Sequence, residues 1–299
     1  MGRRYRIYDV FTRRALTGNP LAVVLDCDGL DPETMQALAR ELNLSETVFV
    51  LPADNPAHSA RVRIFTPMSE LPFAGHPTIG TAVCLAAERF GADRREQDAV
   101  VVLEEGIGPV RCGVRLNQAS GFAEFDCPRL PRALGEASSR GEIAAALNLA
   151  PADITFENHR PSVWSAGLPY HFVPVHDMAA LAAAQPVREA WTAAFGNDSA
   201  FLYTRETEGH DHQFRARMFA PMHGIDEDPA TGSAVAALAG PVHQFDAPPD
   251  GEHLALVEQG HDMGRPSLIR LEMVVGRGAL QTVRIGGDAV RLADGTLDV

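Results

Sequence analysis

The 299-residue chain has 45% hydrophobic and 22% charged residues, which is typical of a globular protein with enough apolar mass for two domain cores. Its formal net charge of −13 argues against nucleic acid or an anionic membrane as the main partner. No apolar run is long enough to span a bilayer, and the basic N-terminus leads into a strand pattern instead of a signal core. We therefore expect a cytoplasmic protein with no membrane partner.

The apolar pattern predicts strands and helices along the whole chain. In the first half we expect strands at 5–11, 21–25, 46–51 and 61–66, helices at 32–42 and 77–90, and a hairpin of 99–104 and 109–116. In the second half we expect helices near 140–148, near 177–195 and after residue 228, with strands around 162–175, 199–204, 213–219, 253–257, 267–275 and 280–285, then a turn-rich tail.

A duplicated motif organises the chain. Arg63-Ile64-Phe65-Thr66-Pro67-Met68 returns as Arg217-Met218-Phe219-Ala220-Pro221-Met222, and His76-Pro77-Thr78-Ile79-Gly80 returns as Asp228-Pro229-Ala230-Thr231-Gly232. The separations are 217 − 63 = 154 and 228 − 76 = 152 residues. The repeat predicts two α+β lobes, each a curled, mostly antiparallel sheet flanking one central helix. We place the lobes at residues 1–122 and 123–299, and leave open whether the last strand packs on the first lobe.

The two helix starts are the predicted site. Pro77 and Pro229 suit the first helical position, so His76 and Asp228 are expected to be the N-caps. The unpaired N–H groups that follow form an anion-binding end. Two such ends facing each other across a cleft between the lobes would hold a small carboxylate. The alternative is two ordinary capped core helices, but two copies in register favour a shared site.

Glu46 begins an otherwise apolar strand, Glu46-Thr47-Val48-Phe49-Val50-Leu51. By the two-residue period its side chain shares a face with Val48 and Val50. Partial desolvation there would raise the pKa of the carboxyl towards the range useful for proton transfer. The alternative, a strand-end glutamate that reaches water, stays open.

Other chemistry is weakly signalled. The four cysteines have no Cys-x-x-Cys spacing, so we expect them to be reduced. His210-Asp211-His212 resembles a metal pair, but its polar surroundings favour a solvated loop, and we predict no metal. The chain has no P-loop and no dinucleotide fingerprint, so we predict no cofactor. His171, His223 and Arg265 receive no role.

Six motifs resemble one known family, the phenazine-biosynthesis PhzF-like proteins, and they run from residue 8 to near the C-terminus. They are Tyr8-Asp9-Val10-Phe11-Thr12, Gly18-Asn19-Pro20-Leu21-Ala22-Val23-Val24, Asn43-Leu44-Ser45-Glu46-Thr47, Glu70-Leu71-Pro72-Phe73-Ala74-Gly75-His76-Pro77-Thr78, Glu227-Asp228-Pro229-Ala230-Thr231-Gly232-Ser233-Ala234 and Gln259-Gly260-His261-Asp262-Met263-Gly264-Arg265-Pro266-Ser267. The resemblance implies a diaminopimelate-epimerase-like fold of two pseudo-symmetric lobes, each a barrel-like sheet around a central helix.

The resemblance also implies a cofactor-independent isomerase, typified by conversion of trans-2,3-dihydro-3-hydroxyanthranilate, and a homodimer. Glu46 would move a proton between two carbons, while His76, Asp228 and Ser233, with the amides of Gly75 and Gly232, would orient the substrate. The related two-cysteine epimerases need a thiol at each helix start. This chain departs from that pattern, which argues against two-base racemisation.

The sequence thus predicts an isomerase of a small carboxylate-bearing metabolite, cyclic or unsaturated, with Glu46, His76 and Asp228 as its catalytic residues. The enzymatic alternative is an epimerase of an amino-acid-like substrate that uses the same cleft. The alternative from another class is a small-molecule-binding protein without catalytic activity.

Overall fold

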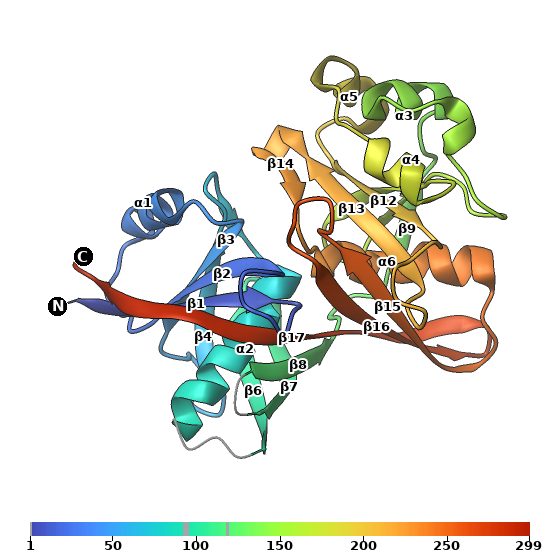
Figure 1. Ribbon diagram of the computed structural model, residues 1–299. Coiled ribbons are helices and arrows are strands. Elements are labelled where there is room, and N and C mark those ends of the chain that lie inside the picture. Colours follow the sequence, from blue (N-terminus) through green and yellow to red (C-terminus); the bar gives the residue numbers. More distant parts are fainter. Residues whose placement is uncertain (1, 92–95, 118–119) are drawn as a thin grey trace. The chain divides into compact units, whose positions relative to one another are not determined.

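The computed structural model describes residues 2–91, 96–117 and 120–299, and the chain divides into two compact units (Figure 1). Unit 1 comprises Met1–Pro128 and Gly286–Val299, and unit 2 comprises Arg129–Ile285. The first unit therefore ends six residues after the predicted boundary at 122, because the strand Ser120–Asp126 belongs to its sheet. No helix within the described residues is long and apolar enough to cross a membrane.

The described residues of unit 1 form ten elements before the chain enters unit 2. They are β1 (Arg3–Val10), β2 (Asn19–Val24), α1 (Pro32–Leu42), β3 (Glu46–Leu51), β4 (Ala60–Phe65), β5 (Glu70–Leu71), α2 (Gly75–Phe90), β6 (Gln97–Glu105), β7 (Gly108–Leu116) and β8 (Ser120–Asp126). The helix α1 begins as predicted, since the Asp31 side chain accepts from the Thr34 N–H and Pro32 occupies the first turn.

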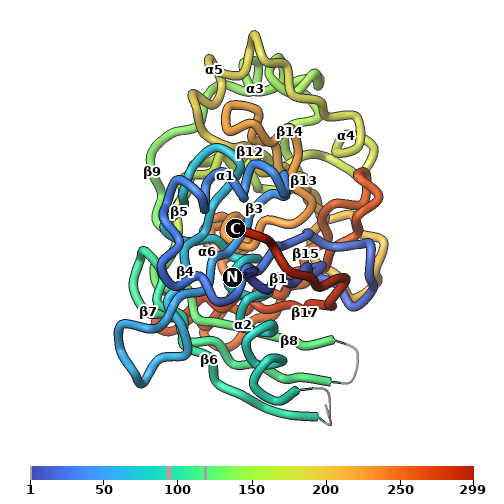
Figure 2. The backbone as a smooth tube through the Cα atoms, turned by 90° about the vertical axis from the view of Figure 1, so that its left-hand side faces the viewer, coloured from blue at the N-terminus to red at the C-terminus, as the bar shows by residue number. Residues whose placement is uncertain are grey.

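The strands of unit 1 close into a barrel. The pairing order is β1-β2-β3-β4-β6-β7-β8-β17 and back to β1, where β17 is the last strand of the chain (Ala279–Leu297). The neighbours pair antiparallel except β2 with β3 and β4 with β6, which are parallel. Because β1 pairs with β17, with Arg3 opposite Leu297, the two ends of the chain lie side by side (Figure 2).

The helix α2 runs through this barrel and packs against β1, β2, β3, β6, β7 and β8. Twelve of its 16 residues are buried, so its alanines and glycines face strands on nearly every side. A Cβ at Gly80 would lie 2.8 Å from the Val10 Cγ2 atom of β1. Small residues are thus required where the helix passes the sheet most closely.

Unit 2 has the same plan with added helices. Its elements are β9 (Arg132–Gly135), α3 (Arg140–Leu147), β10 (Ser162–Ser165), β11 (Pro169–Pro174), α4 (Met178–Ala183), α5 (Arg188–Phe195), β12 (Ser199–Thr204), β13 (Phe214–Ala220), β14 (Ile225–Asp228), α6 (Gly232–Asp246), β15 (Gly251–Gln259), β16 (Ser267–Gly276) and the start of β17. The central helix is α6, which packs against β9, β10, β11 and β16. Figure 1 shows α3, α4 and α5 gathered at one end of this unit, over a core that includes Trp191, Phe195 and Leu202.

The duplication is visible in the strand registers. In unit 1, Ala60 of β4 pairs with Leu103 of β6, and in unit 2, Phe214 of β13 pairs with Val257 of β15. Each residue of the pair in unit 2 lies the same number of residues after its counterpart in unit 1, 214 − 60 = 154 and 257 − 103 = 154. The predicted fold class, two α+β units that each wrap a mostly antiparallel sheet around one helix, is confirmed.

The predicted helix caps are wrong. The N-cap of α2 is Ala74 in an extended conformation, so His76 and Pro77 are the second and third helical residues. Proline is tolerated there because the N–H groups of the first turn have no partner within the helix. The N-cap of α6 is Thr231, because Asp228 is held in β14 by its pairing with Met218 of β13.

Two further predictions are wrong. The single helix expected at 177–195 is two short helices, because Pro186 lies in the stretch between α4 and α5 and lacks the N–H that a continuous helix needs. The expected turn-rich tail is instead the second half of β17, which pairs with β1 from Ala289 to Leu297. Its glycines and aspartates give no strand signal, and the pairing with β1 makes it a strand.

Gly240 provides a test of how tightly α6 is enclosed. A Cβ at this position would lie 2.7 Å from the Cδ2 atom of the Trp164 indole on β10. We expect Gly240→Ala to reduce the free energy of unfolding by about 1–3 kcal/mol, despite the better helix propensity of alanine, because the ring cannot move aside. Denaturant unfolding measures this change.

Gly141→Ala is the matched control, because a Cβ in that turn of α3 lies 4.0 Å from the Ser139 Oγ atom, an ordinary contact. We expect this variant to be unchanged or slightly more stable. A Gly240→Ala variant as stable as the wild type would contradict the packing described here.

Candidate functional site

The predicted site residues Glu46 and His76 meet inside unit 1. Glu46 is the first residue of β3 and pairs with Leu21 of β2, and His76 lies in the first turn of α2. The His76 Nε2 atom lies 3.4 Å from the Glu46 Oε2 atom. The side chain of Glu46 is 13% exposed and that of His76 is 4% exposed, so both groups are largely shielded from solvent.

Asn19 determines which nitrogen of His76 carries the proton. Its Nδ2 atom lies 3.3 Å from the His76 Nδ1 atom, and an amide nitrogen can only donate. Nδ1 is therefore the acceptor, and the N–H of the neutral ring is at Nε2, on the side of Glu46. Burial lowers the pKa of His76 to about 3, so the ring is neutral at physiological pH.

The start of α2 adds an electropositive surface to this site. The N-cap Ala74 has no side chain that could accept from the N–H groups of the first turn, which include those of Gly75 and His76. These groups lie at the positive end of the helix dipole. The arrangement suits a ligand carboxylate better than a second protein side chain.

Asp228 lies in a comparable setting inside unit 2. It is the last residue of β14 and is 5% exposed, and its Oδ2 atom accepts a hydrogen bond of 2.6 Å from the Thr231 hydroxyl. Gln259, at the end of β15, donates from Nε2 to the Asp228 carbonyl and accepts the Thr231 N–H at Oε1. These bonds fix the short connection between β14 and α6.

The start of α6 carries the other two predicted residues. Gly232 is its first residue and Ser233 its second, and the N-cap Thr231 makes no side-chain bond to the first-turn N–H groups. The Ser233 hydroxyl lies 2.7 Å from the Tyr170 hydroxyl on β11. Each unit therefore contains one half-site, built from a helix N-terminus and a mostly buried carboxylate.

Sequence reasoning missed Asn19, Tyr170, Thr231 and Gln259. Asn19 follows Gly18 in a stretch that has the composition of a turn, and Tyr170 comes from a strand far from the duplicated motif. Gln259 lay inside a motif that was recognised only as a resemblance, and Thr231 lay inside the duplicated motif, where it received no role. The repeat itself offered a signal, because residue 259 − 154 = 105 is also polar at the end of an apolar strand.

Within the described residues, one group could hold a metal by distance alone, formed by Glu157, His159 and Asp246. The Arg205 guanidinium already binds both carboxylates of this group, and the His159 Nδ1 atom lies 2.9 Å from the Tyr203 hydroxyl. The arginine supplies the positive charge that a metal ion would supply. We therefore assign these residues to a structural ion network.

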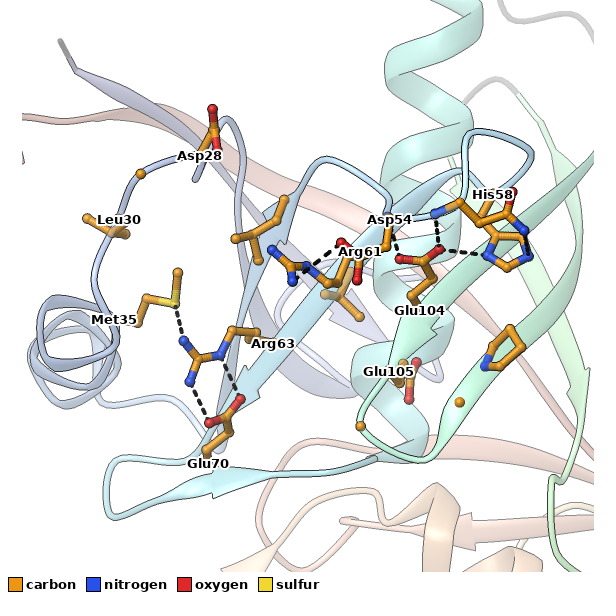
Figure 3. Close-up of a pocket in the computed structure, with 17 residues that line it drawn as sticks. Asp28, Leu30, Met35, Asp54, His58, Arg61, Arg63, Glu70, Glu104 and Glu105 are labelled. Carbon is orange, nitrogen blue, oxygen red and sulfur yellow. Dashed lines mark hydrogen bonds and ion pairs between the residues drawn. The ribbon is translucent and has the colours of Figure 1, made fainter.

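A separate cavity of about 920 Å³ opens within unit 1 (Figure 3). Its charged side chains are largely paired with one another. Arg63 binds both carboxylate oxygens of Glu70, and the His58 Nδ1 atom lies 2.8 Å from the Glu104 Oε1 atom. Neither Glu46 nor His76 lines this cavity, so it is distinct from the candidate site.

Comparison with known proteins gives one consistent result. A sequence model of the family described as "Phenazine biosynthesis-like protein" matches residues 8–295. An uncharacterized isomerase of Mesorhizobium japonicum is 52% identical, over 99% of this chain and 98% of that protein. The trans-2,3-dihydro-3-hydroxyanthranilate isomerase of Pseudomonas aeruginosa is 36% identical, over 98% of each chain.

A solved structure extends the match to the whole fold. The crystal structure of the Bacillus anthracis phenazine biosynthesis protein of the PhzF family superposes with a TM-score of 0.89 at 25% identity, over 100% of both chains. The fold predicted from the resemblance, the diaminopimelate-epimerase-like fold, is thereby confirmed.

The environment of His76 predicts its protonation state. We expect its imidazole to remain neutral between pH 5 and 8, with the proton on Nε2, because burial holds the pKa at about 3. Long-range nitrogen–proton NMR spectra report both properties, and comparison with His76→Asn identifies the signal. A ring that becomes protonated near pH 6.5 would contradict the enclosed geometry.

The lowered pKa of His76 also affects the stability of the fold. The unfolded chain takes up a proton at the ordinary histidine pKa near 6.5 and the folded chain does not, so stability falls as the pH drops from about 6.5 towards 3. His76→Asn should lose this component, which is worth up to ~1.4 kcal/mol per pH unit.

Proposed function

Because the chain belongs to the phenazine biosynthesis-like protein family, we propose that it is a cofactor-independent isomerase that moves a proton between two carbons of a small carboxylate-bearing metabolite. Membership of an isomerase family rests on the relatives. The proton transfer itself is supported by one observation above the others: the Glu46 carboxyl and the neutral His76 ring lie 3.4 Å apart and are largely shielded from solvent.

In this proposal Glu46 is the general acid and base. Its carboxylate removes a proton from one carbon, and the resulting acid delivers a proton to another carbon of the substrate. One carboxyl can perform both steps. The Glu46 side chain is 13% exposed, so in heavy water its proton can exchange with solvent before it is delivered, and the product then carries deuterium.

His76 and Asp228 orient the substrate and stabilise the charge that develops on it. The neutral His76 ring can donate from Nε2 to a hydroxyl, carbonyl or carboxylate oxygen. Asp228 can accept from an amino or hydroxyl group, as it accepts from the Thr231 hydroxyl.

The substrate carboxylate would bind first-turn N–H groups at a helix start, either that of Gly75 in α2 or that of Gly232 in α6, where the Ser233 hydroxyl is the next residue's side chain. A fixed set of donors at helix N-termini stabilises a carboxylate and any enolate-like charge conjugated with it. This donor set supports a small, anionic, cyclic or unsaturated metabolite. Trans-2,3-dihydro-3-hydroxyanthranilate is the first candidate, from the relative that is 36% identical.

The two alternatives make different predictions. A two-thiol epimerase is disfavoured because Cys84, the cysteine inside α2, is buried, and burial raises the pKa of its thiol to about 12. A one-base epimerase would exchange one stereocentre without moving a double bond. A binding protein would hold the ligand and would not exchange any of its protons.

Homodimer formation and a cytoplasmic location stay predictions: the first comes from the family resemblance and the second from the sequence.

Replacement of Glu46 by glutamine tests the proposal. Wild-type protein in heavy water should incorporate deuterium into, or rearrange, one member of a panel of cyclic amino and hydroxy acids that includes the dihydro-hydroxyanthranilate. We expect Glu46→Gln to reduce this rate about 100-fold or more, because the amide cannot accept the proton. NMR measures the rate, and ligand binding should persist.

Glu41→Gln is the control, since Glu41 is an exposed glutamate on α1 outside the site. This variant should exchange at the wild-type rate. Retention of most activity in Glu46→Gln would remove Glu46 from the mechanism. Tight binding of a panel member by the wild type with no exchange would favour the binding protein.

A further inference from the structure

Two adjacent residues at the end of β6 have counterparts at the end of β15. Glu104 and Glu105 close β6, and Glu258 and Gln259 close β15, with 258 − 104 = 154 and 259 − 105 = 154. These are the same shifts that relate the strand registers of the two units. The first residue of each pair is a glutamate in both units. The second is Glu105 in unit 1 but Gln259 in unit 2, so a comparison of their contacts shows what this position requires.

Glu104 holds a loop of unit 1 in its ionised form. Its carboxylate accepts the N–H groups of Asp54 and Asn55 at 2.7 and 2.8 Å, and its Oε1 atom lies 2.8 Å from the His58 Nδ1 atom. The two backbone bonds hold the pKa of this carboxyl below its ordinary value. Only an acceptor group fits this position.

Glu258 does the same in unit 2. It accepts the N–H groups of Glu208 and Gly209 and lies 2.6 Å from the His212 Nδ1 atom. Burial alone would raise the pKa of this carboxyl, but the bonds from Gly209 and His212 outweigh burial and lower it. Glu104 and Glu258 thus occupy equivalent positions, and each holds a loop in place by accepting its N–H groups as an ionised carboxylate.

Gln259 shows what the second position requires. It is fully buried, donates 2.8 Å from Nε2 to the Asp228 carbonyl, and accepts the Thr231 N–H at Oε1. The side chain thus needs one donor and one acceptor, which a neutral amide provides. Its partners belong to the connection that leads from Asp228 into α6.

Glu105 occupies the equivalent place against the start of α2. It is 8% exposed, and its Oε1 atom lies 2.8 Å from the Thr78 hydroxyl. The same hydroxyl lies 2.8 Å from the carbonyl of Ala74, the N-cap of α2. A hydroxyl has one hydrogen, and a carbonyl can only accept. Both contacts are hydrogen bonds together only if Glu105 is protonated and donates to Thr78.

We propose that Glu105 is a positioning residue that works as a neutral carboxylic acid, the counterpart of the Gln259 amide, and that it fixes the first turn of α2 through Thr78 and Ala74. The role in catalysis rests on the proposed function, because that turn carries Gly75 and His76. The protonation state and the effect on the turn do not depend on it.

The surroundings of Glu105 favour the neutral form. Thr78 faces it from α2, and the buried Cys112 on β7 lies near it, so neither neighbour carries a positive charge that would stabilise a carboxylate. On β4, Arg61 and Arg63 are paired with Asp54 and Glu70. Glu105 has no ion pair within the described residues, and burial raises its pKa to about 8.

Ionisation would rearrange these bonds. An ionised Glu105 can only accept, so the Thr78 hydroxyl would donate its single hydrogen to Glu105. The hydrogen bond from the Thr78 hydroxyl to the Ala74 carbonyl would then be lost. The carboxylate would also be a buried charge with a single hydrogen bond, which is costly. The N-terminal turn of α2 would therefore shift as the pH rises through about 8.

The direct test follows the Glu105 carboxyl carbon by NMR as a function of pH, with the His76 ring and the Gly75 amide in the same sample. In the wild type all three signals should shift with one midpoint near pH 8, and in Glu105→Gln the His76 and Gly75 shifts should disappear. A Glu105 midpoint near pH 4.5 overturns the neutral acid. His76 and Gly75 signals that ignore the Glu105 titration overturn the positioning role.

Stability gives a second readout. The folded chain keeps the Glu105 proton between pH 4.5 and 8 while the unfolded chain loses it, so the stabilisation present at low pH is lost as the pH rises through this range. The unfolding constant of the wild type should rise relative to that of Glu105→Gln by up to about tenfold per pH unit. A constant ratio overturns the proposal.

Two variants serve as controls. Gln259→Glu places an acid in the amide position and should acquire the same pH dependence. Glu104→Gln removes an ionised anchor and should be destabilised at neutral pH, opposite to Glu105→Gln. If exchange activity is found, its alkaline limit should move to higher pH in Glu105→Gln. If none is found, the NMR titration still decides whether Glu105 positions the turn.

Discussion

The enclosure of one helix by a sheet is the constraint on which the rest of each unit depends. A helix buried on nearly every side still ends in N–H groups that need partners. In α2 and α6 the N-caps are Ala74 and Thr231, and neither provides a side-chain bond to the first turn. Each unit therefore presents a donor-rich helix end in a largely apolar setting, and the polar residues around it make it a site.

The polar groups around these ends divide into two kinds. In the proposed function Glu46 and Asp228 act on the substrate, while Asn19 and Gln259 bind the residues of the site, and Glu105 is proposed to position the first turn of α2. Asn19 fixes the proton of His76, and Gln259 fixes the backbone of Asp228. The duplication preserved this division even where the residues changed, since an acid in unit 1 and an amide in unit 2 occupy the same position.

The sequence predicted most of the architecture, because periodicity and the 154-residue repeat report on local structure. It also brought forward Glu46 and His76, whose proximity the structure supports. The sequence prediction failed where pairing between distant strands determines the structure. Asp228 is held in a strand by Met218, and the end of β17 is a strand because it pairs with β1. The neutral state of Glu105 also escaped prediction, since it depends on contacts with Thr78 and Cys112.

The return of β17 to the first unit has a consequence for how the chain is made. During synthesis on the ribosome, β1 and β8 emerge before the whole of unit 2, and the strand that joins them follows that unit. Until then the nascent barrel has two open edges, which are templates for aggregation. Closure pairs Arg3 with Leu297, a contact of very high sequence separation that folds slowly. The barrel of unit 1 therefore closes only after the whole of unit 2 has been synthesised.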